Sequence, residues 1–325
     1  MSRGRIALVA ALVVVYAGCY SAIKLGLAYA PPLLFAGLRA GLGGVALLAV
    51  LSVTGRPLVP PRDLRAGVLG LALLGTLLGY GAMFLSPGRT GAGLSSVLGN
   101  TGPILLVVLG ALFLAEPLTR RRVEGVALGA LGVFLIAHPA LTGPGLEGAG
   151  AVLVPLGAAA GSAGASVLLK RLRVGDRLLT VTAWQLVAGA VPLLLLSVLL
   201  EDVGSVRWSW AFLLLLGFLS LVGTGAALYA WYWLVQREEV GRLAVFLFGV
   251  PVAGLALAWA AFGETMGTME TIGVALTLAG ILRVVVPQSR RAGSERVAVG
   301  GGEGSPMSRG AIPASSARSG QSGEG

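Results

Sequence analysis

Residues 103–118 read PILLVVLGALFLAEPL, and the part from Ile104 to Leu114 is apolar on every side. A strand of a membrane barrel would alternate polar and apolar residues over about ten positions, and this run does not alternate. A helix surrounded by apolar side chains is suited to a lipid bilayer. The stretch therefore predicts a membrane-spanning helix.

The composition of the whole chain agrees with a bilayer environment. Of 325 residues, 56% are hydrophobic and 12% are charged, and the mean hydropathy is +0.88. A soluble domain has about a quarter of its residues charged. The net charge of +10 is scattered between apolar runs, so we expect no nucleic-acid partner. With one cysteine, Cys19, and one histidine, His138, we expect no metal, no cofactor and no enzymatic centre.

Ten apolar runs approach the length of about 20 residues that a helix needs to cross a bilayer. Charged, Pro or Gly residues separate them, as at Arg56-Pro57 and Arg120-Arg121-Arg122. We therefore predict an all-α integral membrane protein with ten transmembrane helices. The runs are 6–23, 33–53, 66–86, 92–114, 123–138, 149–169, 178–199, 209–233, 243–262 and 271–287.

The positions of Lys and Arg predict the orientation. With a cytoplasmic N-terminus, 20 of the 24 basic residues fall in cytoplasmic segments, and Arg39 falls inside the second run. The opposite side holds only Lys24, Arg89 and Arg207. We therefore expect an inner (plasma) membrane protein with both termini in the cytoplasm. The Gly- and Ser-rich residues 288–325 predict a disordered cytoplasmic tail.

The chain repeats itself at an offset of 148 residues, which becomes 146 further upstream. This register predicts two repeats, 1–139 and 140–287. The residues that carry it are Leu73, Gly75 and Thr76 on Leu221, Gly223 and Thr224, Pro103 on Pro251, Glu116 on Glu264, Gly125 to Leu128 on Gly273 to Leu276, and, upstream, Arg39 on Gln185.

Each repeat holds five predicted spans, and an odd number makes the second repeat enter the membrane from the opposite side. Inverted repeats recur in secondary transporters, which bind cargo near the midplane between the halves. The sequence therefore predicts a transporter that moves a small molecule across the lipid bilayer. A structural or sensory membrane protein is the alternative, and a homodimer remains open.

The residues also carry a resemblance. Span one reads YAGCYSAIK at 16–24, and span four runs from AGL at 92–94 through Pro103 to LAEPLT at 114–119. The second copy keeps Pro251 and FGE at 262–264. Over residues 6–287 the chain resembles the EamA family of the drug/metabolite transporter superfamily. The resemblance implies a ten-helix plasma-membrane permease that exports small metabolites such as amino-acid-like solutes. Efflux of lipophilic or cationic drugs is the alternative.

Residues of the fourth span are the first candidates for a cargo site. Ser96, Asn100 and Pro103 share one helix face. The amide of Asn100 needs a partner at that depth, either cargo or another helix. Pro103 and its match Pro251 lie in the middle of spans four and nine. Each removes a backbone hydrogen bond and bends its helix, so both are predicted hinges.

Charged residues give a second group of candidates, for a gate or an anion site. Arg39 lies about two turns inside span two. Its guanidinium is either an anion-binding or gating group within the membrane, or it extends to the membrane interface. Lys24 at the membrane surface binds either a substrate carboxylate or lipid headgroups. Glu116 and Glu264 end the fourth helix of each repeat, which predicts paired gate or helix-end contacts.

Aromatic residues complete the predicted cargo site. Tyr16 and Tyr20 lie one turn apart on span one, so one helix face could carry both hydroxyls. Trp and Tyr near span ends form the interfacial belt instead, which is the alternative role. The remaining candidates for the cargo site are Tyr16, Tyr20, Tyr80, Trp184 and Tyr229, together with Gln185, which the repeat register matches to Arg39.

Overall fold

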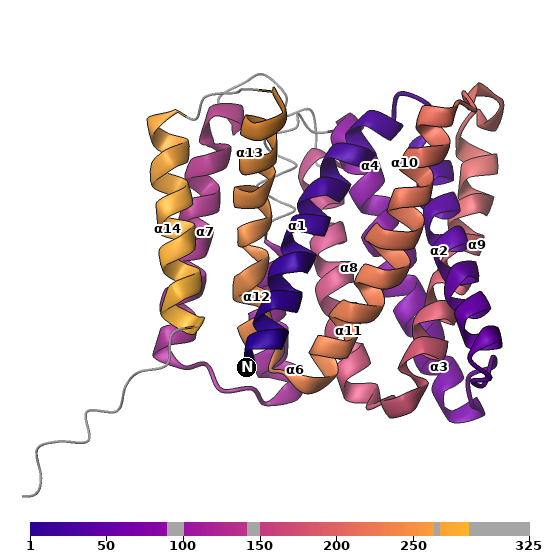
Figure 1. The fold of residues 1–325 in the computed structure, drawn as a ribbon, viewed down its shortest axis with the longest axis horizontal. Coiled ribbons are helices and arrows are strands. Elements are labelled where there is room, and N and C mark those ends of the chain that lie inside the picture. The colour runs from indigo at the N-terminus through magenta and orange to yellow at the C-terminus, as the bar shows by residue number, and fades with distance from the viewer. Residues whose placement is uncertain (90–100, 142–149, 263–266, 286–325) are drawn as a thin grey trace, which may run out of the picture. The chain divides into compact units, whose positions relative to one another are not determined.

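The computed structural model describes residues 1–89, 101–141, 150–262 and 267–285 of the chain. Every regular element in these residues is a helix (Figure 1). The first half contains α1 (Arg3–Gly26), α2 (Pro32–Val53), α3 (Arg62–Leu71), η1 (Ala72–Tyr80), α4 (Gly81–Arg89), α6 (Gly102–Leu114) and α7 (Arg120–Leu141). The second half contains α8 (Gly150–Leu172), η2 (Gly175–Arg177), α9 (Leu178–Leu200), η3 (Val203–Ser205), α10 (Trp210–Ser220), η4 (Leu221–Ala226), α11 (Ala227–Arg237), α12 (Val240–Leu247), α13 (Gly249–Phe262) and α14 (Thr268–Val285).

Long apolar helices confirm a multi-pass, all-α membrane protein. Helices of this length and apolarity match the hydrocarbon thickness of a bilayer. Shorter apolar helices cover Gly102–Leu114, Val240–Gly254 and Thr271–Val284. The count of ten spans stays a prediction. The segments long and apolar enough to cross are Arg3–Gly26, Pro32–Val53, Arg62–Ser86, Leu153–Leu172, Gly175–Leu200 and Trp210–Arg237.

Two of the long helical runs contain a π-helical segment, which the sequence analysis does not predict. η1 lies between α3 and α4, and η4 lies between α10 and α11. The offset of 148 residues places 73–78 on 221–226, so the two wide turns occupy matched positions. π-Helical turns are rare and concentrate at functional sites.

Helices α2 and α9 pack side by side in opposite directions. A Cβ added to Gly37 would lie 2.7 Å from Leu194, and one added to Gly44 would lie 2.7 Å from Val187. Later residues of α2 therefore contact earlier residues of α9, as in an antiparallel pair. Glycines let the two backbones approach, which is how membrane helices gain van der Waals contact.

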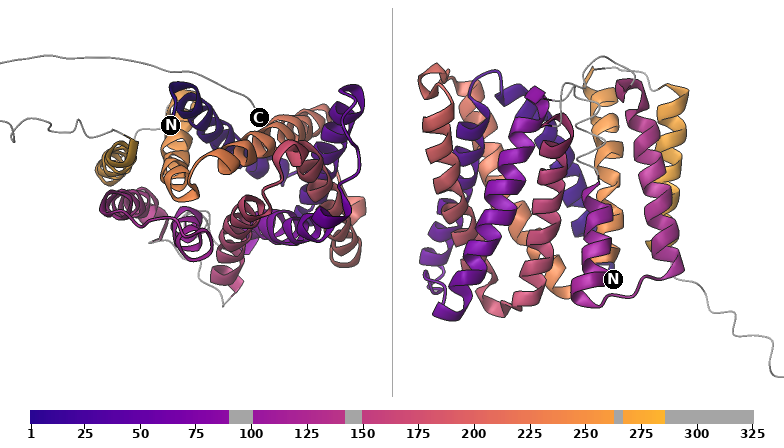
Figure 2. Two further views of the ribbon diagram at one scale, coloured as in Figure 1. Left: turned by 90° about the horizontal axis from the view of Figure 1, so that it is seen from below. Right: turned by 180° about the vertical axis from the view of Figure 1, so that it is seen from behind.

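Helices α7 and α14 form a second antiparallel pair, visible at one edge in Figures 1 and 2. A Cβ on Gly125 would lie 2.9 Å from the Gly280 carbonyl oxygen, and one on Gly132 would lie 2.5 Å from that of Gly273. These glycines are matched by the offset of 148. The same contact is thus made twice, with the two helices exchanged.

The two prolines predicted as hinges lie close to helix boundaries. Pro103 is the second residue of α6, a position at the start of a helix where proline is favoured. Span nine consists of two helices, because α12 ends at Leu247 and α13 begins at Gly249. Pro251 is the third residue of α13, and the backbone bond that it cannot make would lead to the carbonyl of Leu247, the last residue of α12. The hinge role of both prolines stays a prediction.

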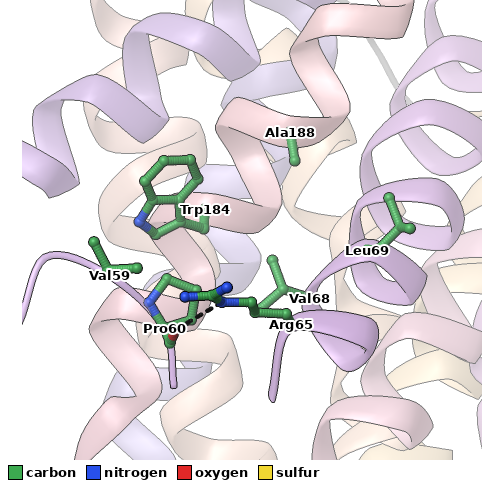
Figure 3. Close-up of a pocket in the computed structure, with 7 residues that line it drawn as sticks. All are labelled: Val59, Pro60, Arg65, Val68, Leu69, Trp184 and Ala188. Atoms are coloured by element: carbon green, nitrogen blue, oxygen red, sulfur yellow. Dashed lines mark hydrogen bonds between the residues drawn. The ribbon is translucent and has the colours of Figure 1, made fainter. Parts of the chain in front are cut away.

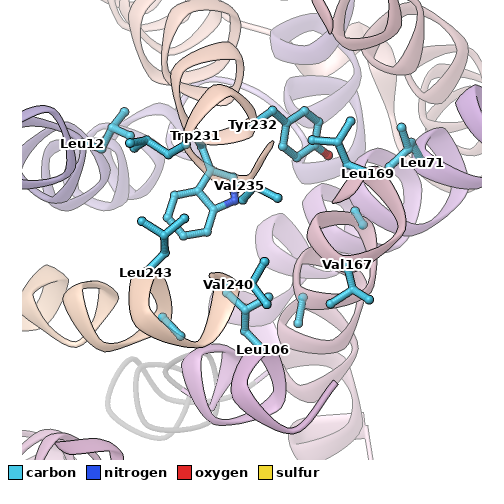
Figure 4. Packing of buried hydrophobic residues seen from close by; sticks show 14 of the residues in the cluster. Leu12, Leu71, Leu106, Val167, Leu169, Trp231, Tyr232, Val235, Val240 and Leu243 are labelled. Carbon is cyan, nitrogen blue, oxygen red and sulfur yellow. The ribbon is translucent and has the colours of Figure 1, made fainter. Parts of the chain in front are cut away.

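Buried apolar side chains form three clusters between the helices. The largest joins α1, α3, α6, α8, α9, α11 and α12 around Trp231 and Tyr232 (Figure 4). The indole Nε1 of Trp231 donates to Ser166 Oγ at 3.1 Å, which satisfies its polar atom. A second cluster surrounds Phe35 and Phe84, and a third fills the contact between α2 and α9.

Candidate functional site

Arg39 on α2 is a buried cation with neutral partners. Only 2% of the surface of Arg39 is exposed. Nε donates to Thr224 Oγ1 at 2.6 Å, and Nη2 donates to the Gly223 carbonyl oxygen at 3.1 Å. Nη1 is buried and has no hydrogen-bond partner in the described part of the chain. The π-helical segment η4 thus holds two sides of the guanidinium and leaves one donor free.

Aromatic rings enclose the same guanidinium. Its carbon Cζ lies 5.0 Å from the ring centroid of Tyr80 and 5.6 Å from that of Phe84. Such rings attract a cation through their π faces. Tyr16 on α1 lies in the neighbourhood of Arg39 and Tyr80. A Cβ on Gly223 would lie 2.4 Å from Cys19 Sγ, so α1 also reaches η4. We call Tyr16, Cys19, Arg39, Tyr80, Phe84, Gly223 and Thr224 the Arg39 centre.

Gln185 on α9 makes the matching contacts in the second repeat. It is 1% exposed, and its backbone carbonyl accepts a hydrogen bond from Thr76 Oγ1 at 3.4 Å. A Cβ on Gly75 would lie 2.7 Å from Gln185 Nε2 and 3.5 Å from the Tyr232 hydroxyl. Gln185 Oε1 is buried without a hydrogen-bond partner among the described residues. Arg39 and Gln185 therefore each contact the Gly-Thr pair of the π-helical segment in the opposite repeat.

Glu116 binds the N-terminus of another helix. Its carboxylate accepts hydrogen bonds from the backbone N–H of Val240 at 2.8 Å and of Gly241 at 2.9 Å. These groups open α12, where N–H groups lack intrahelical partners and the helix dipole favours an anion. Lys170 Nζ lies 3.0 Å and Arg122 Nη1 lies 3.7 Å from the carboxylate. Glu116 thus makes a helix-end contact and a buried ion pair at once.

Two further carboxylates extend this ion-pair network. Glu238 pairs with Arg5 at 2.7 Å and with Arg242 at 3.8 Å, and its backbone carbonyl accepts from Lys170. Glu239 pairs with Arg122. The network ties the start of α1 to the start of α7, the end of α8 and the start of α12. We call Arg5, Glu116, Arg122, Lys170, Glu238, Glu239 and Arg242 the Glu116 cluster.

Trp184 is adjacent to Gln185 in sequence but faces a different part of the molecule. It lines an open, largely apolar pocket with Val59, Pro60 and Arg65 (Figure 3). Its indole Nε1 donates to the Leu58 carbonyl oxygen at 2.6 Å. Trp184 is therefore anchored to the loop after α2, and no polar contact connects it to the described part of the Arg39 centre.

The structure also places the other predicted residues for which it gives side chains. Lys24 is exposed in the last turn of α1, and Tyr229 is half-buried on α11 among apolar side chains. Tyr20 is described only by its place on α1. Ser96, Asn100 and Glu264 lie outside the described residues.

Several residues of the Arg39 centre and of the Glu116 cluster are not among the site residues that the sequence predicts. Gly223 and Thr224 are predicted only as repeat matches, although a Gly-Thr pair kept in both copies is the signal that marks them. Glu238 and Glu239 form an acidic pair between two apolar runs, a second readable signal. Nothing in the sequence marks Phe84. In the described ranges, no group of three His, Cys, Asp or Glu residues could hold a metal ion.

Comparison with known proteins identifies the family. The profile of the EamA-like transporter family matches residues 4–138 and again 149–286. The chain belongs to the EamA-like transporter family. This EamA-like protein is accordingly a permease of the drug/metabolite transporter superfamily and a transporter, not an enzyme.

Relatives cover almost the whole EamA-like region. A Salmonella typhimurium protein named "Probable amino-acid metabolite efflux pump" is 31% identical over 299 residues, 86% of this chain and 94% of that protein. An Escherichia coli protein of the same name is 28% identical over 290 residues, 86% of this chain and 94% of that protein. An uncharacterized Bacillus subtilis transporter is 28% identical over 275 residues, 83% and 92% of the two chains. A crystal structure of a protein 20% identical shares the fold, with a TM-score of 0.75 over 88% of this chain and 97% of its own.

Proposed function

We propose that this EamA-like protein is a secondary transporter of small metabolites, amino-acid-like solutes among them, and that it exports them across the inner (plasma) membrane. It works by alternating access between two inverted five-helix halves, residues 1–139 and 140–287. Both termini and the tail 288–325 are cytoplasmic.

The exchange of matched contacts carries the proposal. Arg39 contacts η4 of the second half, and its match Gln185 contacts η1 of the first half. The matched pairs α2 with α9 and α7 with α14 run antiparallel, as two halves related by an axis in the membrane plane would. In transporters of this kind the cargo site lies between the halves, and interrupted helices line it. The break between α12 and α13 provides such an interruption.

The Glu116 cluster supports a state that is closed on the cytoplasmic side. Its four basic residues come from segments that the distribution of Lys and Arg assigns to the cytoplasm. Ion pairs and backbone hydrogen bonds link both halves here, since Glu116 and Arg122 belong to the first and Lys170, Glu238 and Glu239 to the second. Opening toward the cytoplasm would require these contacts to separate.

The cargo class is supported by two relatives named as amino-acid metabolite efflux pumps. The buried charge of Arg39 also disfavours a cationic drug between the halves, because like charges repel strongly where water is excluded. Small neutral, zwitterionic or anionic solutes fit this interior better.

Transport by the purified full chain in liposomes tests the proposal. Vesicles are loaded with a pooled set of amino acids and metabolites, and release is followed with and without an imposed pH gradient. Saturable movement of one compound class is expected, and its response to the gradient shows whether protons are coupled. If folded, inserted protein moves none of the compounds, the transporter proposal is wrong.

A further inference from the structure

The Arg39 centre holds a positive charge that no carboxylate of the described chain neutralises. Ion pairs elsewhere in the described residues all involve other cations. The partners of Arg39 are the Thr224 hydroxyl, the Gly223 carbonyl and the rings of Tyr80 and Phe84. All four groups are neutral, so the centre carries a net charge of its own.

A guanidinium has five N–H donors, and the neutral partners of Arg39 in the described chain accept from only two of its three nitrogen atoms. Burial of an ion without a counter-ion is costly, and protein interiors keep such charges paired or assign them a function. Two donor atoms of Arg39 are engaged, and Nη1 has no partner although it is buried. The free Nη1 and the neighbouring Nη2 have the fork geometry that binds both oxygens of a carboxylate.

A polar acceptor is available in the matched position. Gln185 is as deeply buried as Arg39, and its Oε1 has no partner in the described chain. Tyr232 approaches Gln185 beside Gly75, and Tyr16 lies near both Arg39 and Tyr232. The two matched positions thus differ in chemistry: one offers a cationic donor, and the other offers an amide acceptor. Such a pair suits a solute with a carboxylate at one end and a hydrogen-bond donor at the other.

We propose that Arg39 is the subsite for the carboxylate of the cargo, with Gln185 as a second polar contact, so that the substrates are small organic monoacids, amino acids included. This inference rests on the proposed transport function and specifies its substrate class. The carboxylate supplies the negative charge that the Arg39 centre lacks. Tyr80 and Phe84 then hold the cation from its faces, and η4 fixes its Nε and Nη2.

Binding of acids and their amides tests the subsite. The probes are the amino acids that the purified full chain binds in detergent, each compared with its carboxamide, which lacks the negative charge but keeps nearly the same shape. Binding is measured as a ligand-dependent rise in unfolding temperature and as competition for counterflow in liposomes. Wild-type protein should bind the acid at least tenfold more tightly than the amide.

Three variants separate the charge from its geometry. Arg39→Lys keeps the charge and loses the fork, so affinity for the acid should fall at least tenfold. Arg39→Gln should remove the preference for acid over amide. Arg65→Gln changes an exposed arginine outside the Arg39 centre and should leave both affinities unchanged. If Arg39→Gln fails to fold, Arg39→Lys and the acid-to-amide ratio of the wild type decide.

The outcomes also distinguish this inference from the transport proposal. Equal affinity for acid and amide, or an unchanged ratio in the Arg39 variants, overturns the carboxylate subsite. Transport of amines or neutral solutes with no bound acid overturns the subsite and leaves the transport function standing. Absence of all transport by folded protein overturns both.

Discussion

Replacement of Glu116 by alanine should destabilise the protein more than any other single loss of an ion pair in its described part. Glu116 is 8% exposed and accepts two backbone hydrogen bonds at the start of α12. Loss of such an N-terminal cap costs about 1–2 kcal/mol. Loss of the charged hydrogen bond from Lys170, whose side chain is 23% exposed, adds about 1.5–3 kcal/mol.

The expected total for Glu116→Ala is therefore about 3 kcal/mol, because Lys170 and Arg122 each retain another oxygen. Lys170 keeps the Glu238 carbonyl, and Arg122 keeps Glu239. Glu116→Gln retains one carbonyl oxygen for a backbone N–H but loses the charge, and about half the cost is expected. A loss of about 3 kcal/mol corresponds to a fall of roughly 6–12 °C in the unfolding midpoint.

The assay is thermal unfolding of the purified variants in one detergent, followed by tryptophan fluorescence. Glu124→Gln is the matched control, since Glu124 also contacts two cations, Arg120 at 2.9 Å and Arg283 at 2.7 Å, but on an exposed surface. Its unfolding midpoint should move little, because exposed ion pairs contribute little. The assignment of Glu116 as a buried cap is refuted if both Glu116 variants unfold at the wild-type temperature. It is also refuted if Glu124→Gln lowers the unfolding temperature as much as Glu116→Ala does.

Two further predictions concern helix packing and the position of Trp184. Gly189→Ala and Gly43→Ala should each lower the free energy of unfolding by about 1–3 kcal/mol, because the added Cβ would lie 2.3 Å from Thr76 Cβ and 2.8 Å from the Ser220 carbonyl oxygen. Chemical unfolding checks this against Gly217→Ala, where a Cβ meets no atom within 4 Å and no loss is expected. Trp184→Phe removes the hydrogen bond to the Leu58 carbonyl and leaves a smaller ring, but both changes lie outside the Arg39 centre, so the transport rate in liposomes should stay within about twofold of wild type. A tenfold loss from folded Trp184→Phe protein would place that side chain in the cargo site instead.

The sequence reveals the helices because hydropathy and length report on the solvent directly. A run such as Ile104–Leu114, in a chain of ten such runs, favours a lipid-embedded helix over a barrel strand. The repeat register is readable because Pro, Glu and Thr matches are rare in this composition. The same uniform apolarity hides which face of each helix looks inward. Trp184 and Gln185 are neighbours on α9, about 100° apart around the helix, and only the fold shows that they face different surroundings.

Positions that depend on contacts between distant segments were not readable. Glu116 was readable as a matched residue near a span end. Its partners at the start of α12 become neighbours only when residues more than 120 positions apart meet.

Reversible cross-linking across the Glu116 cluster tests alternating access most directly. Arg122→Cys and Glu239→Cys are combined with Cys19→Ala and joined by a short thiol-cleavable linker between the two halves. In liposomes, cross-linking should stop exchange of a transported amino acid, and cleavage of the linker should restore it. Exchange that continues at the same rate in fully cross-linked protein would contradict the proposed cycle.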